Sequence, residues 1–177
     1  MPDDLNARVA AYFQRRPAAM TMVAAQELGV PEVEVLRALG AAELRAEALE
    51  EILGELAGWG RCHVIVSNRG ATLEAYGTFG GFSRKGPFLN VETETLDMHL
   101  RPAAIRAAFC LDKRGHRDAQ PIHTVQFYDD RGDAVLKVVM IRDAETKRYA
   151  PEQEARYEVL KARFALGKSV DSASGPP

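Results

Sequence analysis

Apolar residues follow two different spacings along this chain, and the change falls at Gly58–Gly60. Before it they recur every three or four residues, as on the buried face of a short helix. After it they alternate with polar residues, as in strands with one buried face. An apolar stripe at helical spacing returns from Pro151 onward. The pattern predicts an α+β fold with a mainly antiparallel β-sheet, and it places helices over residues 5–16, 21–28, 31–39, 41–57 and from 151 to the mid-160s. It also predicts a strand over residues 104–111, followed by a charged hairpin loop over residues 112–118.

Residues 121–143 carry the strongest strand signal. Two β-rich runs flank the Gly-containing turn Asp129–Asp133, which predicts a hairpin. The second run, Ala134–Ile141, is apolar on both faces except at Lys137, which is typical of a central strand. A cation there is costly unless an anionic or polar group meets it, or unless its stem lies on apolar surface while the ammonium reaches water. Lys137 is therefore a candidate functional residue.

Residues 21–39 have the pattern of a helix-turn-helix, with Gly29 ending one short helix and Pro31 opening the next. DNA binding is one interpretation of such a pair. However, Glu32 and Glu34 stand at the start of the second helix, where phosphates would lie. Plain packing is the alternative, and contact with nucleic acid is not expected.

The first predicted strands present alternate side chains to two faces. Over residues 61–67, His63 and Ile65 lie on the face opposite Cys62 and Val64. The following glycine-rich link, residues 77–88, carries two adjacent cations but matches neither phosphate-binding glycine motif. It is interpreted either as a loop beside a cleft for an anionic ligand or as a plain surface connection.

Two side chains in this region suit a haem iron, which accepts His or Tyr as an axial ligand. His99 falls on the polar side of a strand whose other side carries Leu96, Met98 and Leu100. Tyr76 also lies on the polar face of its strand. The four histidines show no zinc spacing, and no GxSxG motif is present.

Composition narrows the class of protein. The chain has 177 residues and a formal net charge of −2, which argues against a large nucleic-acid footprint. Its two cysteines show no spacing pattern, so a reducing compartment is expected. No signal peptide or membrane span is visible, which favours a cytoplasmic protein. A single domain is expected over residues 1–166, with a helical part (1–58), a sheet part (59–143), a C-terminal helix (144–166) and then a disordered tail (167–177).

The chain resembles the HutX/ChuX family of haem-utilisation cytosolic carrier proteins over residues 20–164. The strand at 136–143 is the most specific landmark, because the family shows a Lys followed by an Arg-Asp pair at the spacing of Lys137 and Arg142-Asp143. The order and spacing of all the landmarks carry the resemblance. The others are Leu28-Gly29-Val30-Pro31, the run Glu34–Leu39, the Trp59-Gly60 junction, Leu73–Gly77, Gly86–Phe88 and His99.

The resemblance implies a large curved sheet, usually completed across a homodimer, with haem held in a cleft. Related larger haem-trafficking proteins resemble two such units in tandem. It further implies an intracellular protein that binds haem reversibly, exchanges it with donor or acceptor proteins and is not an enzyme. By position, His99 is the candidate axial ligand of the haem iron. The candidate haem-binding residues are His99, Tyr76, Arg84, Lys85, Phe88, Lys137 and Arg142.

Two positions depart from the family pattern. Pro87 stands where some relatives have a haem-ligating Tyr, and Ser67 stands where some have a His. Two other functions stay open: a haem-degrading or porphyrin-modifying enzyme, and a ligand-sensing regulator built on the helix pair.

Overall fold

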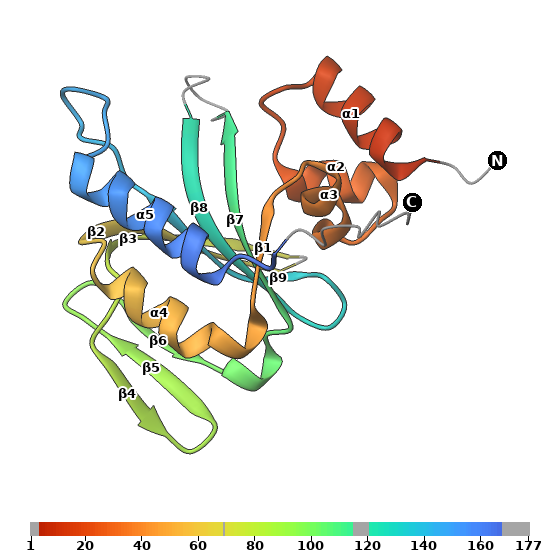
Figure 1. The fold of residues 1–177 in the computed structure, drawn as a ribbon. Helices are drawn as coiled ribbons and strands as arrows, with labels where there is room; N and C mark the ends of the chain where they lie inside the picture. The colour runs from red at the N-terminus through yellow and green to blue at the C-terminus, as the bar shows by residue number, and fades with distance from the viewer. Residues whose placement is uncertain (1–3, 69, 115–120, 168–177) are drawn as a thin grey trace, which may run out of the picture.

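Five α-helices and two antiparallel sheets make up residues 4–68, 70–114 and 121–167, the part of the chain that the computed structural model describes (Figure 1). The helices are α1 (Leu5–Arg15), α2 (Thr21–Leu28), α3 (Glu32–Ala38), α4 (Leu49–Ala57) and α5 (Pro151–Phe164). The strands are β1 (Ala42–Leu44), β2 (Arg61–Ser67), β3 (Thr72–Thr78), β4 (Phe82–Lys85), β5 (Phe88–Glu92), β6 (Asp97–Leu100), β7 (Ala107–Arg114), β8 (Pro121–Tyr128) and β9 (Ala134–Met140). The predicted α+β class, with helices, antiparallel sheet and C-terminal helix in that order, is confirmed.

The larger sheet has the strand order β1-β7-β8-β9-β2-β3, and the smaller has the order β4-β5-β6. The predicted hairpin is β8–β9, and both of its strands are central. The Asp129 carboxylate accepts hydrogen bonds from the backbone N–H groups of Arg131 and Asp133, which holds the turn. Gly132 adopts a φ of 78°, and a Cβ there would lie 2.8 Å from Pro31 Cβ. The turn therefore needs glycine both for its backbone and for its contact with the start of α3.

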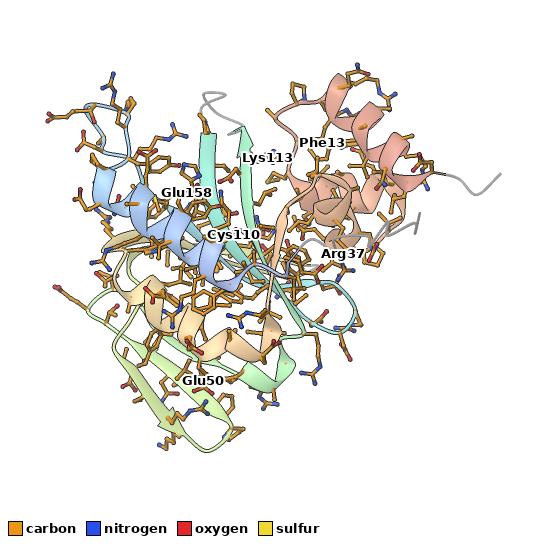
Figure 2. The ribbon with its side chains drawn as sticks, in the orientation of Figure 1. Phe13, Arg37, Glu50, Cys110, Lys113 and Glu158 are labelled. Atoms are coloured by element: carbon orange, nitrogen blue, oxygen red, sulfur yellow. The ribbon has the colours of Figure 1, made fainter. Side chains whose placement is uncertain are left out.

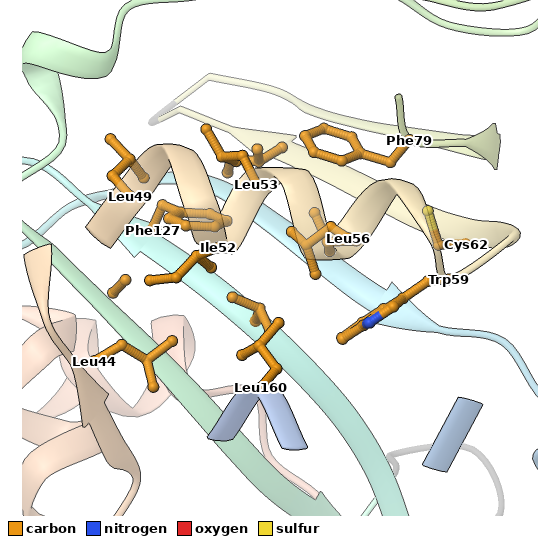
Figure 3. Close-up of a cluster of buried hydrophobic side chains, with 14 of the residues drawn as sticks. Leu44, Leu49, Ile52, Leu53, Leu56, Trp59, Cys62, Phe79, Phe127 and Leu160 are labelled. Carbon is orange, nitrogen blue, oxygen red and sulfur yellow. The ribbon is translucent and has the colours of Figure 1, made fainter. Parts of the chain in front are cut away.

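One face of the six-stranded sheet, the helix-covered face, is buried under α4 and α5. Figure 3 shows Ile52, Leu53 and Leu56 of α4 projecting into a cluster with Phe127 of β8 and Leu160 of α5. Trp59 and Phe79 close the cluster beside the small sheet, which adds Leu89, Val91 and Leu100. This cluster is the main apolar core.

The other face, the open face, carries the three-helix bundle α1–α3 at one end. The bundle has a small apolar cluster of its own, centred on Val9, Tyr12 and Val35. It rests on the sheet through Val33 and Leu36, which pack against side chains of β7 and β8. Since α3 is largely buried by these contacts, it is not presented to a DNA groove. This placement favours the packing interpretation of the helix pair over the DNA-binding one.

Three predicted boundaries were wrong. The helix expected over residues 41–57 begins only at Leu49, because Ala42–Leu44 pairs with β7 as a short strand. The glycine-rich link is not a loop throughout, since residues 82–85 form β4 and pair with β5. The strand expected from residue 104 begins at Ala107, after a 3₁₀ turn at Pro102–Ala104.

The outer edge of β1 is covered by the end of α5. Arg45 donates its backbone N–H to Phe164 O at 2.8 Å, and Leu166 donates to Glu43 O at 2.8 Å. Leu44 and Ala165 form an isolated β-bridge between these two bonds. The β1 edge of the sheet is therefore already paired within the chain.

Two predicted segments lie mostly outside the described residues: the charged hairpin loop over residues 112–118 and the disordered tail over residues 167–177. Within the described ranges, no helix has the length and apolar character needed to cross a membrane.

Candidate functional site

A cavity of about 530 Å³ lies on the open face of the six-stranded sheet, between the strands and the three-helix bundle. Its volume falls in the range of about 300–1,000 Å³ typical of small-molecule sites. The bundle contributes Met20, Thr21 and Met22. The strands β2, β3, β7, β8 and β9 contribute most of the rest, namely His63, Ile65, Ser67, Thr72, Glu74, Tyr76, Leu111, Lys113, Ile122, Thr124, Gln126, Lys137, Val139 and Met140, and the segment after β9 adds Arg142 and Tyr149.

Strand pairing sets the side chains of the cavity floor next to one another. His63 pairs with Tyr76 on one side and with Val139 on the other, and Val139 pairs with Thr124. Residues paired across antiparallel strands point to the same face. The floor therefore changes from an aromatic end at β2–β3 to an apolar and hydroxyl-bearing middle at β8–β9.

The aromatic end contains three groups that can interact with a metal or with a proton. The rings of His63 and Tyr76 are stacked, with centroids 4.3 Å apart and planes 8° apart. His63 Nε2 lies 3.1 Å from a carboxylate oxygen of Glu74. The imidazole and the phenol are both known types of axial haem ligand. A neighbouring carboxylate can orient a ligating imidazole and raise its basicity.

Cations lie along the rest of the cavity. Lys137 Nζ is 2.5 Å from Glu32 Oε1, and that carboxylate also accepts a hydrogen bond from Thr21 Oγ1 at 2.5 Å. The Lys113 ammonium lies 5.5 Å from the centre of the Phe13 ring, and Figure 2 shows the two labelled side chains between β7 and α1. Burial, and then the charge of Lys137, lower the pKa of Lys113. The cavity therefore holds two lysines close enough to repel one another.

A chain of hydrogen bonds runs beneath the cavity, next to the ion pair. The Tyr128 hydroxyl donates to Gln126 Oε1, and Gln126 donates from its amide nitrogen to Thr124 Oγ1 at 2.7 Å. Thr124 donates in turn to Leu111 O at 3.3 Å. Burial, with Glu32 nearby, raises the pKa of Tyr128 well above its ordinary value. These buried polar groups are paired with one another, as buried polar groups generally must be.

Three of the residues predicted from the sequence meet in this cavity: Tyr76, Lys137 and Arg142. Arg142 donates to Pro121 O at 3.0 Å and lies 5.4 Å from the centre of the Tyr149 ring. Of the two alternatives for Lys137, a polar partner or an ammonium that reaches water, the structure shows the partner: it is Glu32, 105 residues earlier in the chain.

The other four predicted residues lie on the small sheet and do not line the cavity. His99 is exposed on β6, with Nδ1 2.9 Å from Asn90 Oδ1 and its ring edge-on to Phe88. Arg84 forms an ion pair with Glu50 on α4, and Lys85 is exposed. Within a single chain, the expected axial ligand His99 is therefore separate from the cavity, and its role stays a prediction.

Sequence reasoning did not select His63 or Lys113 as site residues. Strand alternation places His63 on the same face as Ile65 and Ser67, opposite Cys62 and Val64. The sequence therefore indicated which residues share a face with His63. What the alternation could not show was which face the helices α4 and α5 would cover. Lys113 lay in a run interpreted as a charged loop, whereas it belongs to β7.

The whole fold has solved relatives. A protein from Agrobacterium tumefaciens has 26% sequence identity, with 92% of each chain covered and a TM-score of 0.78. The heme binding protein ChuX has 17% identity, with 88% of this chain and 97% of ChuX covered and a TM-score of 0.77. The heme degrading enzyme ChuS of Escherichia coli O157:H7 has 24% identity and a TM-score of 0.75, with 92% of this chain but only 47% of ChuS covered. Among curated proteins, none matches this chain.

The likeness to ChuX and ChuS is one of fold. Because ChuS is matched over about half its length, the predicted similarity to half of a larger haem protein is confirmed at the level of fold. The family model described as haem utilisation ChuX/HutX matches residues 42–160, which span the whole six-stranded sheet, α4 and most of α5. The chain belongs to the haem utilisation ChuX/HutX family.

Proposed function

We propose that this protein binds haem reversibly in the open-face cavity and carries it within the cytoplasm between donor and acceptor proteins. The observation that carries the proposal is the composition of the cavity. An apolar floor of Ile65, Leu111 and Val139 lies between an imidazole–phenol pair at one end and cations at the other. A haem needs the same three features: apolar surface for the macrocycle, an axial ligand for iron and positive charge for its propionates. Membership of the haem utilisation family supports this choice of cargo.

Within one chain, His63 is the best-placed axial ligand. Its ring lies on the cavity floor, and Glu74 can act as the carboxylate partner that fixes the imidazole. Tyr76, stacked on His63, is the second candidate. His99 stays a candidate if a second copy of the chain brings its small sheet to this cavity.

A homodimer is part of the proposal. Strand β3 ends the six-stranded sheet, so its outer backbone edge has no strand beside it in the described structure. Two large side chains on this strand are exposed, Leu73 at 60% and Tyr76 at 44%. An exposed strand edge with apolar side chains favours pairing with another chain. Sedimentation of the wild type should give twice the mass of the chain, and Leu73→Lys should shift it toward the monomer. A monomeric wild type would rule out the dimer.

Titration with hemin tests the function. The wild type should give a saturating Soret band at about one haem per chain. His63→Ala and His99→Ala form a matched pair, since both remove an imidazole, one from the cavity and one from the small sheet. We expect His63→Ala to change the band and weaken affinity by about tenfold or more, a change of about 1.4 kcal/mol or more in binding free energy. A change only in His99→Ala would return the ligand to His99, and the absence of any saturating band would reject haem binding.

The carrier role is tested separately from binding. The haem complex is incubated with a reductant and oxygen, and the pigment is then extracted. Recovery of intact haem is expected for a carrier, whereas conversion to an open-chain product would identify an enzyme.

A further inference from the structure

The carboxylate of Glu32 is buried next to the residues that line the cavity. Glu32, in the first turn of α3, is only 5% exposed and does not itself line the cavity. It reaches Lys137, which does line the cavity, at 2.5 Å, and Thr21 donates to the same oxygen. This cavity-lining cation is thus already paired with a carboxylate of the protein.

The surroundings of this ion pair favour exchange of one carboxylate for another. Lys113 and Lys137 both line the cavity, and burial together with the charge of Lys137 lowers the pKa of Lys113, so an anion near the two ammonium groups would be favourable. Lys137 also carries a flexible stem, which can turn its ammonium from one oxygen partner to another without movement of the strand.

The bundle does not depend on the ion pair alone for its position. Val33 and Leu36 on the same helix pack against Phe109 and Tyr128, and the start of α3 fits against Gly132 in the β8–β9 turn. Glu32 can therefore lose its partner while α3 stays in place. The exchange would involve two side chains rather than the movement of a domain.

We propose that Glu32 is an internal competitor for the carboxylates of the cargo: it holds Lys137 in the cargo-free protein and gives the lysine up to a propionate when a tetrapyrrole binds. This inference rests on the proposed haem-binding function and adds a specificity-determining residue to it. Its consequence is that Glu32 weakens the binding of carboxylate-bearing tetrapyrroles selectively. A carrier that must release its cargo benefits from such a competitor, because the same carboxylate reclaims the lysine as cargo leaves.

The test compares hemin with its dimethyl ester, which has the same macrocycle and iron but no free carboxylates. In the full-length chain, Glu32→Gln should bind hemin about tenfold more tightly than the wild type, through slower dissociation. Binding of the ester should change by less than twofold. Glu34→Gln is the matched control, because Glu34 lies on the same helix but pairs with exposed Arg37. It should change neither affinity.

A double-mutant cycle guards against a variant that folds poorly. Lys137→Met should weaken hemin binding about tenfold, since the incoming propionate then has no lysine to pair with. Adding Glu32→Gln to Lys137→Met should change hemin binding by less than about twofold, because no lysine remains for Glu32 to hold back. The gain from Glu32→Gln should appear only when Lys137 is present.

The outcomes separate the two proposals. Binding of hemin by the wild type with no gain in Glu32→Gln, or an equal gain for the ester, would overturn the competitor role and leave haem binding intact. A wild type that binds neither hemin nor its ester would overturn both.

Discussion

The two faces of the six-stranded sheet are formed by the same strands, but one face is buried under helices whereas the other carries the cavity. On the helix-covered face, Cys62, Val64, Val125 and Val138 are buried beneath α4 and α5 in a continuous apolar core. On the open face, the alternate residues of those strands include a histidine, a threonine, a glutamine and a lysine. The α1–α3 bundle covers one end of that face, and the cavity lies between the bundle and the strands.

The difference lies in what covers each face rather than in the strands themselves. A strand presents alternate side chains to its two faces, so one strand can contribute both to an apolar core and to a polar site. Val138 and Val139 are neighbours of the same type on β9, yet one belongs to the core and the other to the cavity. Stability and binding should therefore respond separately to substitutions on the two faces.

Lys137 is expected to depart most from this separation between stability and binding. It lies on the open face, yet its side chain is mostly buried and paired with Glu32. Lys137→Met leaves the Glu32 carboxylate buried without its cation, which typically costs about 3–5 kcal/mol. Denaturant unfolding of the cargo-free protein should show this loss. Adding Glu32→Gln to Lys137→Met should recover most of the lost stability. Stability of Lys137→Met equal to that of the wild type would contradict a stabilising Lys137–Glu32 ion pair.

Val138 and Val139 supply the sharpest test of the two faces. Val138→Ala removes two methyl groups from a fully buried site and should lower the free energy of unfolding by about 2 kcal/mol. Val139→Ala, on the cavity floor, should cost less than about 1 kcal/mol but reduce hemin affinity. Equal losses of stability, measured by urea unfolding, would show that the open face is packed as tightly as the other.

The smallest effect is expected at Asp112, at the edge of the helix-covered face beneath α5. Burial acts to raise the pKa of this carboxyl, but the hydrogen bonds with His123 and Lys161 act against burial and, with the charge of Lys161, hold the pKa well below the ordinary range. A lowered folded-state pKa means that the ionised form stabilises the fold above about pH 4, and that this contribution is lost as the pH falls further.

Asp112→Asn should therefore reduce stability at pH 7 by about 1 kcal/mol, since Asp112 is 43% exposed and solvent screens its contacts. The difference from the wild type should shrink at pH 3. Unfolding curves at the two pH values measure it, and an equal difference at both would show that charge is not the cause.

Local patterns were sufficient to predict much of this architecture. The β8–β9 hairpin follows from two strand-like runs around a glycine turn, and α5 follows from its proline and its apolar stripe. The pattern failed for β1, because three residues of strand beside a helix are too few to establish a period. That strand forms through pairing with β7 and with the end of α5, which are contacts between distant parts of the chain.

In the candidate site, too, local patterns predicted some features, whereas contacts between distant parts of the chain could not be predicted. The sequence pattern placed Tyr76 on the polar face of its strand, and it singled out Lys137 as a lone cation that either meets a polar partner or reaches water. It could not identify that partner as Glu32, because their contact depends on how the bundle docks. The sequence favoured His99 over His63, through its place on the polar side of a strand and through the family resemblance. The division into two sheets shows that His63, and not His99, lines the cavity.

The paired edge at β1 limits how copies of this chain can associate. A sheet with two open edges can add further copies at both ends and grow into a filament, whereas closed symmetry stops growth. Here the backbone of residues 164–166 already occupies the β1 edge. Among the described residues, the free edge of the six-stranded sheet is that of β3, and one added copy would consume that edge in both partners. The pairing of residues 164–166 with β1 would thus limit sheet extension to two copies.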